Sequence, residues 1–144
     1  MRTNAYRSDR NTCLANEPRL SDLKNLVLNQ ISEPEEQVKY LDAVDKLGTA
    51  FRFMSVAKQP LEPGAAFVWP ILLQRDTIHL FMQRSPISLL LLAHYCVILH
   101  HLDGYWFLHG WYKALLLEIT EIMPSELQPW VLWPKNVCGL VDLL

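Results

Sequence analysis

The sequence predicts an all-α fold: a single-domain bundle of five or six helices around one buried apolar helix. Apolar residues recur at intervals of three and four positions along most of the chain, which is the spacing of one helix face. No stretch of six or more residues alternates as a half-buried strand does. The composition, 51% hydrophobic and 19% charged over 144 residues, also supplies enough apolar surface for a sizeable core.

Residues 86–102 are predicted to form the central helix. Pro86 suits the first helical turn and Ser85 suits the position that caps it. The residues that follow are apolar on nearly every side, so other helices should surround this one. Its apolar run, residues 87–99, is shorter than the about 20 residues that a membrane span requires. We therefore expect a buried helix and no membrane span.

Amphipathic helices are expected on both sides of this helix. The apolar spacing predicts helices over residues 20–32, over 34–54, and from about 65 or 69 to 84, with a linker rich in Pro and Gly over 58–64. Asp103 and Gly104 should end the central helix, before a helix over 106–122 and a short turn over 125–130. Gly48 interrupts the second helix. Close approach of another backbone would explain a glycine at this position. The favoured interpretation is that the helix simply tolerates the glycine.

The chain is expected to divide into an arm and one domain. Residues 1–18 are polar and show no periodicity, so they are predicted to form a mobile N-terminal arm. Residues 19–144 are predicted to form the all-α domain.

Charge and cysteine usage exclude several classes of function. The net charge of −2 argues against a nucleic-acid-binding surface, which needs a concentrated basic face. Cys13, Cys96 and Cys138 lie far apart and are odd in number, so neither a disulfide framework nor a metal-binding motif is expected. No N-terminal apolar segment indicates secretion. An intracellular location, nucleus or cytoplasm, fits best. The sequence has no phosphate-binding Gly-rich loop, CxxC or HExxH motif, so no cofactor is expected.

Histidines gather in and after the central helix. His94 and His101 are seven residues apart, which permits a shared helix face, but Asp103 is the only acidic or cysteine partner of the kind typical of zinc sites. Hydrogen bonding at helix ends or in the core is the favoured interpretation. Cys96 and His100 are four residues apart, but the surrounding leucines argue against a thiolate–imidazole pair. If the chain is an enzyme, which the sequence leaves open, the candidates for acid–base catalysis are His94, His100, His101 and Asp103.

The five tryptophans allow two interpretations. They are Trp69, Trp106, Trp111, Trp130 and Trp133. The first interpretation is a tryptophan-rich core. The second is a pocket between helices that binds a flat hydrophobic ligand.

The stretch LLLLAHYCVILHHLDGYWFLHGW, residues 89–111, is followed by PWVLWP at residues 129–134. These two motifs resemble a known family, the fungal binuclear zinc cluster transcription factors. The similar part is the C-terminal regulatory region of the sterol-uptake-control type, and it spans about residues 41–134. Trp69 matches an earlier tryptophan, and Phe107 stands where the family commonly has a second one. The other matching residues are Leu92, Ala93, His94, Tyr95, Leu99, His100, Leu102, Asp103, Trp106, Gly110, Trp111, Trp130, Leu132, Trp133 and Pro134.

The resemblance implies an all-α regulatory domain with an apolar cavity. The six-cysteine DNA-binding domain of that family is missing, so direct DNA binding is not expected. We expect a stand-alone regulatory or ligand-binding domain that binds a sterol- or terpenoid-like molecule or a protein partner. The expected cavity lining is Trp69, Phe81, His94, Tyr95, Leu99, Trp106 and Trp111, with His94 or His100 as a polar anchor.

Two alternatives remain open. The same pocket would serve a small isomerase or cyclase of fungal secondary metabolism, with help from the histidines and Asp103. The chain would otherwise be a truncated product that competes with a full-length factor for partners. The oligomeric state is not predicted.

Overall fold

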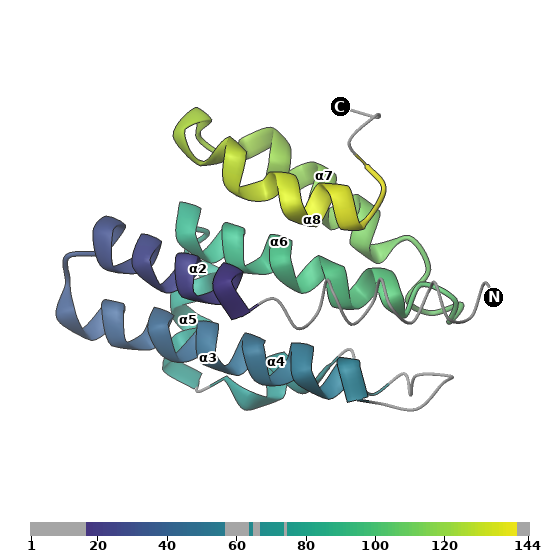
Figure 1. The fold of residues 1–144 in the computed structure, drawn as a ribbon, viewed down its shortest axis with the longest axis horizontal. Coiled ribbons are helices and arrows are strands. Elements are labelled where there is room, and N and C mark those ends of the chain that lie inside the picture. The colour runs from purple at the N-terminus through teal and green to yellow at the C-terminus, as the bar shows by residue number, and fades with distance from the viewer. Residues whose placement is uncertain (1–16, 57–63, 65–66, 74, 141–144) are drawn as a thin grey trace. The chain divides into compact units, whose positions relative to one another are not determined.

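The computed structural model describes residues 17–56, 64, 67–73 and 75–140. These residues contain seven α-helices, a 3-10 helix and no strand (Figure 1). The predicted all-α fold is confirmed. The arm expected over residues 1–18 lies outside the described residues, except for Glu17 and Pro18, which belong to the first helix. Most of the linker expected over 58–64 also lies outside them.

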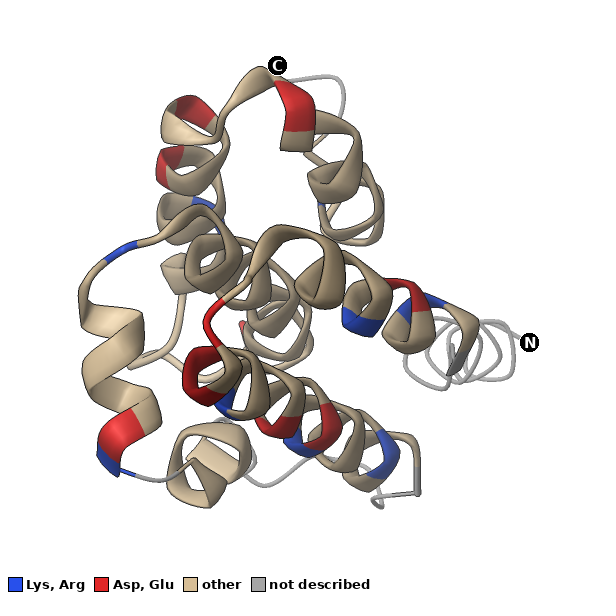
Figure 2. Ribbon diagram, turned by 90° about the vertical axis from the view of Figure 1, so that its left-hand side faces the viewer, with Lys and Arg blue, Asp and Glu red and all other residues tan. Residues whose placement is uncertain are grey.

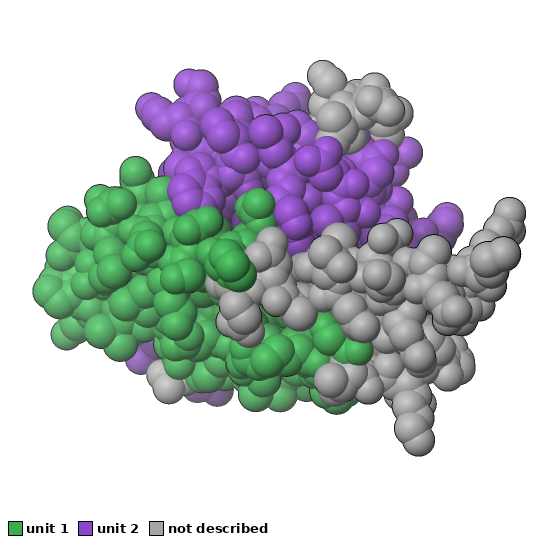
Figure 3. Space-filling view, in the orientation of Figure 1, with its two compact units in different colours: residues 1–73 green, residues 74–144 purple. Residues whose placement is uncertain are grey.

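The chain divides into two compact units, residues 1–73 and 74–144 (Figure 3). The first contains α2 (Glu17–Gln30), α3 (Pro34–Val56) and α4 (Val68–Leu72). The second contains α5 (Arg75–Met82), α6 (Pro86–His101), α7 (Trp111–Ile122), η2 (Ser125–Val131) and α8 (Leu132–Val137). Each unit is described by itself below.

In the first unit, α2 and α3 pack along their apolar faces. A three-residue turn reverses the chain between them, where the Gln37 side-chain amide donates to the Ile31 carbonyl oxygen at 2.9 Å. Pro34 opens α3, and two glutamates follow at the positive end of its dipole. The short α4 brings in Trp69, which is 1% exposed and donates its Nε1–H to the Ala43 carbonyl oxygen at 3.0 Å.

In the second unit, α6 is the central helix, as predicted. It contains no Asp, Glu, Lys or Arg, so it is drawn wholly in tan in Figure 2. Twelve of its residues are buried, because α5, α7, η2 and α8 all pack against it. Ser85 caps it, with its Oγ accepting the Ser88 N–H at 3.2 Å, and Pro86 stands in its first turn. Both features were expected from the sequence.

Two predicted helices differ from the structure. The chain leaves helical geometry at Leu73 (φ −74°, ψ 141°), so α4 and α5 are separate helices. The helix expected from Trp106 begins only at Trp111, because Gly110 before it has a left-handed backbone (φ 82°). Residues 102–110 therefore form a loop, which positions several of the predicted site residues.

Among the described helices, none alone is long and apolar enough to cross a membrane. Only α5 and α6 taken together reach the required length and apolarity, and a bend of 106° separates them.

Candidate functional site

An apolar groove lies between α5, α6 and α7 of the second unit. Its volume is about 290 Å³. Apolar side chains form most of its lining, and Arg84 and Glu118 add one charge of each sign. The apolar residues are Phe81, Met82, Leu89, Leu92, Leu115, Ile119 and Ile122.

A tight turn after α5 shapes this groove. Arg84 has a left-handed backbone (φ 56°), and its N–H donates to the Phe81 carbonyl oxygen at 3.0 Å. This turn lets the chain reverse from α5 into α6, so the apolar face of α5 packs on α6. The floor is buried, with Ile119 1% exposed, whereas Met82 at the edge is 71% exposed and Ile122 50%. The groove is therefore a preformed apolar site that is open to solvent.

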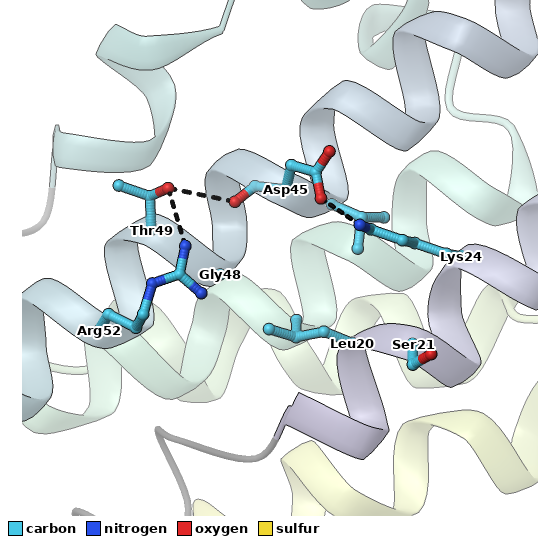
Figure 4. Close-up of a pocket in the computed structure, with 8 residues that line it drawn as sticks. Leu20, Ser21, Lys24, Asp45, Gly48, Thr49 and Arg52 are labelled. Carbon is cyan, nitrogen blue, oxygen red and sulfur yellow. Dashed lines mark hydrogen bonds and ion pairs between the residues drawn. The ribbon is translucent and has the colours of Figure 1, made fainter.

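A second hollow lies on the first unit, between α2 and α3 (Figure 4). Its volume is about 430 Å³, and its lining is mostly polar. Lys24 forms an ion pair with the Asp45 carboxylate, and Arg52 Nη2 donates to Thr49 Oγ1 at 3.3 Å. The remaining lining residues are Leu20, Ser21, Val44 and Gly48. None of the predicted site residues lines this hollow.

Gly48 has a packing role on this hollow. A Cβ atom at this position would lie 2.9 Å from Leu20 Cδ1 and 3.3 Å from Arg52 Nη1. The glycine thus admits the Leu20 side chain of α2 close to the α3 backbone. No backbone atom of another described helix approaches this position, and the closest group is the flexible end of a side chain from the neighbouring helix, so the favoured interpretation of tolerance stays a prediction.

The predicted cavity lining is not brought together around the groove. Only Phe81 lines it. Trp69 lies in the first unit, with its indole N–H bonded to Ala43. The other predicted residues inside α6, His94, Tyr95 and Leu99, are buried in the second unit. Burial raises the pKa of Tyr95 to about 12, so its phenol stays protonated at neutral pH.

The sequence missed most of the groove. Its residues other than Phe81 were predicted only as members of helix faces. A signal existed in α7, where Leu115, Ile119 and Ile122 follow at spacings of four and three. That spacing does not reveal that part of the face stays open to solvent.

Trp106 and Trp111 were expected to border an interior cavity, and they lie at the surface instead. Trp106 is 87% exposed and Trp111 52%. The loop over 102–110 turns them outward: Asp103 Oδ1 accepts the Gly110 N–H at 2.6 Å, and the fully buried Leu108 anchors the loop. Whether either tryptophan contacts a ligand stays a prediction.

The histidines of α6 are held in different settings. His94 is buried, with Nδ1 3.0 Å from the Leu90 carbonyl oxygen and its ring stacked on Trp133. His101 Nδ1 lies 2.8 Å from the Val97 carbonyl oxygen. These contacts agree with the favoured interpretation of helix and core hydrogen bonding.

His100 lies in a partly buried setting at the end of α6. Its ring lies edge-on to Tyr112, with ring centres 4.7 Å apart, and its Nδ1 is buried without a hydrogen bond to the described residues. Burial lowers the pKa of His100, and the Asp103 carboxylate acts in the opposite direction to a smaller extent. The imidazole of His100 is therefore uncharged at neutral pH.

His100 stands away from the apolar groove. Leu92, which lines the groove, and His100 are eight residues apart on one helix, or about 12 Å along its axis. The Asp103 carboxylate serves the loop, where its Oδ2 also lies 3.4 Å from His109 Nδ1. No observation on the groove favours acid–base catalysis, and the enzyme hypothesis stays a prediction.

The buried cysteines offer no nucleophile. Burial raises the pKa of the Cys96 thiol well above its usual range, and the neighbouring Cys138 acts in the same direction. The Cys138 thiol also faces the Cys96 carbonyl oxygen, with Sγ 3.8 Å from it. Within the described part of the chain, no group of three or more His, Cys, Asp or Glu side chains is placed to hold a metal ion.

Comparison with known proteins adds no family assignment. No protein-family model, no curated protein and no solved structure matches the chain. The resemblance to fungal transcription factors stays a prediction.

Proposed function

We propose that this chain is a binding module for a hydrophobic small molecule, which binds in the groove between α5, α6 and α7. One observation carries the proposal: a preformed groove with seven apolar side chains, two of which remain at least half exposed at its edge. Covering apolar surface of this kind is favourable by about 25 cal/mol per Å². A ligand therefore gains affinity without first opening the core.

The size and polarity of the groove narrow the class of ligand. Its volume of about 290 Å³ is at the lower limit of small-molecule sites, which span about 300–1,000 Å³. A compact terpenoid-like molecule suits this volume better than a whole sterol, part of which would stay outside. Arg84 and Glu118 both have exposed side chains at the groove. They offer a hydrogen-bond donor and an acceptor to a ligand with one hydroxyl or carbonyl group.

The proposed role of this binding is regulatory. The sequence resemblance supports a regulatory domain of fungal transcription-factor type that acts in the nucleus or cytoplasm. A ligand that binds the folded groove stabilises that conformation and shifts its population. A protein partner would then respond to the liganded form.

Thermal unfolding with a panel of linear and cyclic terpenoid alcohols and sterols tests the proposal. A ligand at 100 times its Kd stabilises the folded state by about 2.7 kcal/mol, so the midpoint should rise by several degrees. The double variant Leu115→Gln with Ile122→Gln should lose most of the rise, because it places amides in the groove. Ile71→Gln is the matched control, since Ile71 is 77% exposed and lies on α4 of the first unit.

Chemical-shift mapping by NMR would locate the ligand. Chemical-shift perturbations are expected for residues of α5, α6 and α7. The proposal is wrong if no member of the panel raises the midpoint, or if the groove variant responds as the control does.

A further inference from the structure

The loop that joins α6 to α7, shown in green in Figure 1, exposes a cluster of aromatic side chains. We call residues 104–111, which are the end of this loop and the first residue of α7, the aromatic loop. Trp106 is 87% exposed, Trp111 52% and Phe107 38%. The Phe107 ring centre lies 6.0 Å from that of Tyr105 and 5.6 Å from that of Trp106. The rings of Tyr105, Trp106 and Phe107 therefore form one patch and are not scattered single side chains.

The exposure is built into the loop. The Leu108 N–H donates to the Tyr105 carbonyl oxygen at 3.0 Å, and the Trp111 N–H donates to the Leu108 carbonyl oxygen at 3.2 Å. Leu108 is fully buried, and the Asp103 carboxylate holds the Gly110 N–H at 2.6 Å. With Leu108 fixed inward, the preceding Trp106 and Phe107 are directed to solvent.

The charged residues nearest to this patch in the sequence are Asp103 before it and Lys113 after it. Residues 104–117 contain no Asp or Glu. The nearest carboxylate before them, Asp103, is engaged by the Gly110 N–H and by His109, and its side chain is 28% exposed. The exposed Lys113 follows in the first turn of α7. The patch is therefore apolar and aromatic, and the exposed charge that follows it is positive.

We propose that the aromatic loop docks on the surface of a membrane that contains anionic lipids. Trp106 and Phe107 would enter the interfacial layer, and Lys113 would face the lipid headgroups. Indole rings favour this layer because they join an apolar body to one polar N–H. Basic residues beside such rings are attracted to an anionic leaflet. The binding is peripheral and reversible.

The size of the patch favours a membrane over a protein partner. A standard protein–protein interface buries about 800 Å² on each side. Full burial of an aromatic side chain contributes about 150–250 Å², and two of these three are already partly covered. A bilayer can accept a few inserted side chains without a large matching surface.

Vesicle co-sedimentation of the full chain tests this proposal, with pure phosphatidylcholine compared with phosphatidylcholine that contains 30% phosphatidylserine. We expect binding to the anionic vesicles that weakens as salt is raised. Trp106→Ser and Phe107→Ser should each reduce the partition coefficient about tenfold or more, because each removes an inserted apolar ring. Lys113→Gln should reduce it about fivefold, on the anionic vesicles only.

Two matched controls distinguish binding through the aromatic loop from nonspecific binding to vesicles. Phe53→Ser replaces a phenylalanine that is 44% exposed on α3, and Arg75→Gln removes an exposed charge at the start of α5. Both should bind vesicles as the unsubstituted chain does. Circular dichroism would verify that each variant is folded, which is expected for Trp106→Ser because that side chain makes little packing contact.

Three outcomes would overturn the proposal. The first is no binding to anionic vesicles. The second is binding that the loop variants leave unchanged, or that is equal on both kinds of vesicle. The third is loop-dependent self-association without lipid, measured by sedimentation velocity, which would assign the patch to a second copy of the chain. None of these outcomes depends on whether the groove binds a ligand.

Discussion

Trp69 and Trp106 occupy opposite environments, although both stand at positions that resemble the same family motif. Trp69 is 1% exposed and hydrogen-bonded to Ala43, and Trp106 is 87% exposed. The difference comes from the backbone around each residue. Trp69 lies on a helix packed against α3, whereas Trp106 lies on a loop whose neighbouring leucine takes the buried position.

Trp69→Phe is expected to destabilise the protein by about 1–3 kcal/mol. The change removes a buried hydrogen bond and leaves part of the indole volume empty. Trp106→Phe is the control, and it should stay within about 0.5 kcal/mol of the unsubstituted chain. Urea unfolding followed by circular dichroism measures both free energies. Equal effects of the two substitutions would contradict the assigned environments.

His100 gives the stability a dependence on pH. Because burial lowers its pKa in the folded chain, the unfolded chain binds this proton more readily. The contribution of His100 is fully present above the ordinary histidine pKa of about 6.5, and it is lost as the pH falls toward the lowered folded value. The unfolding free energy should therefore decrease from pH 7.5 to pH 5.5.

The variant His100→Phe should reduce this decrease, since it keeps a ring against Tyr112 but cannot bind a proton. Urea unfolding at pH 7.5, 6.5 and 5.5 gives the slope for each protein. His79→Gln removes an exposed histidine of α5 and should leave the slope as it is. An identical slope for His100→Phe and the unsubstituted chain would refute the assignment.

At the scale of elements, the cap of α6 is expected to affect stability in a measurable way. Ser85→Ala removes the acceptor for the Ser88 N–H, which should cost about 1 kcal/mol. For a chain of this size, that cost lowers the thermal midpoint by about 2–4 °C. Ser85→Gly should cost only a few tenths of a kcal/mol, because glycine also tolerates this position. If Ser85→Ala leaves the thermal midpoint unchanged, the hydrogen bond from the Ser88 N–H to Ser85 Oγ contributes nothing to stability.

The sequence predicted the elements whose ends have chemical signals. Pro34 and Pro86 each begin a helix in the structure, and the uncharged α6 is the buried centre of its unit. The break at Leu73 has no Gly or Pro beside it, so periodicity alone joined α4 and α5 into one helix. The late start of α7 had a signal in Gly110, whose left-handed backbone favours glycine.

The candidate site was harder to predict than the fold. Aromatic content indicated that a large apolar surface exists, but not which rings face inward. That depends on three-dimensional contacts such as the bond from the Gly110 N–H to Asp103, which joins residues seven apart. Among the predicted lining residues, only Phe81 lines the groove, because it lies on the apolar face of the short amphipathic helix α5. Trp106 faces solvent on the loop between α6 and α7, and Trp111 is half exposed where α7 begins.

At the scale of the whole molecule, both proposed binding surfaces belong to the second unit, which has the smaller share of the charged residues. The groove includes Leu92 of α6, and the aromatic loop begins after the end of that helix. Leu92 and His101 are nine residues apart, which corresponds to about 14 Å along the helix axis. The lining of the groove contains no residue of the aromatic loop. The two surfaces are therefore separate contacts, although Trp111 of the aromatic loop lies one turn of α7 before Leu115 of the groove.

Separate surfaces should behave additively. Ile122→Gln in the groove and Trp106→Ser in the aromatic loop are expected to change ligand binding and vesicle binding independently, with a coupling free energy below about 0.5 kcal/mol. A double-mutant cycle with both readouts, terpenoid affinity and vesicle partition, measures this coupling. Ile122→Gln alone should leave vesicle partition unchanged. A coupling above about 1 kcal/mol would mean that α6 and α7 shift together, so that the membrane contact and the ligand share one conformational equilibrium.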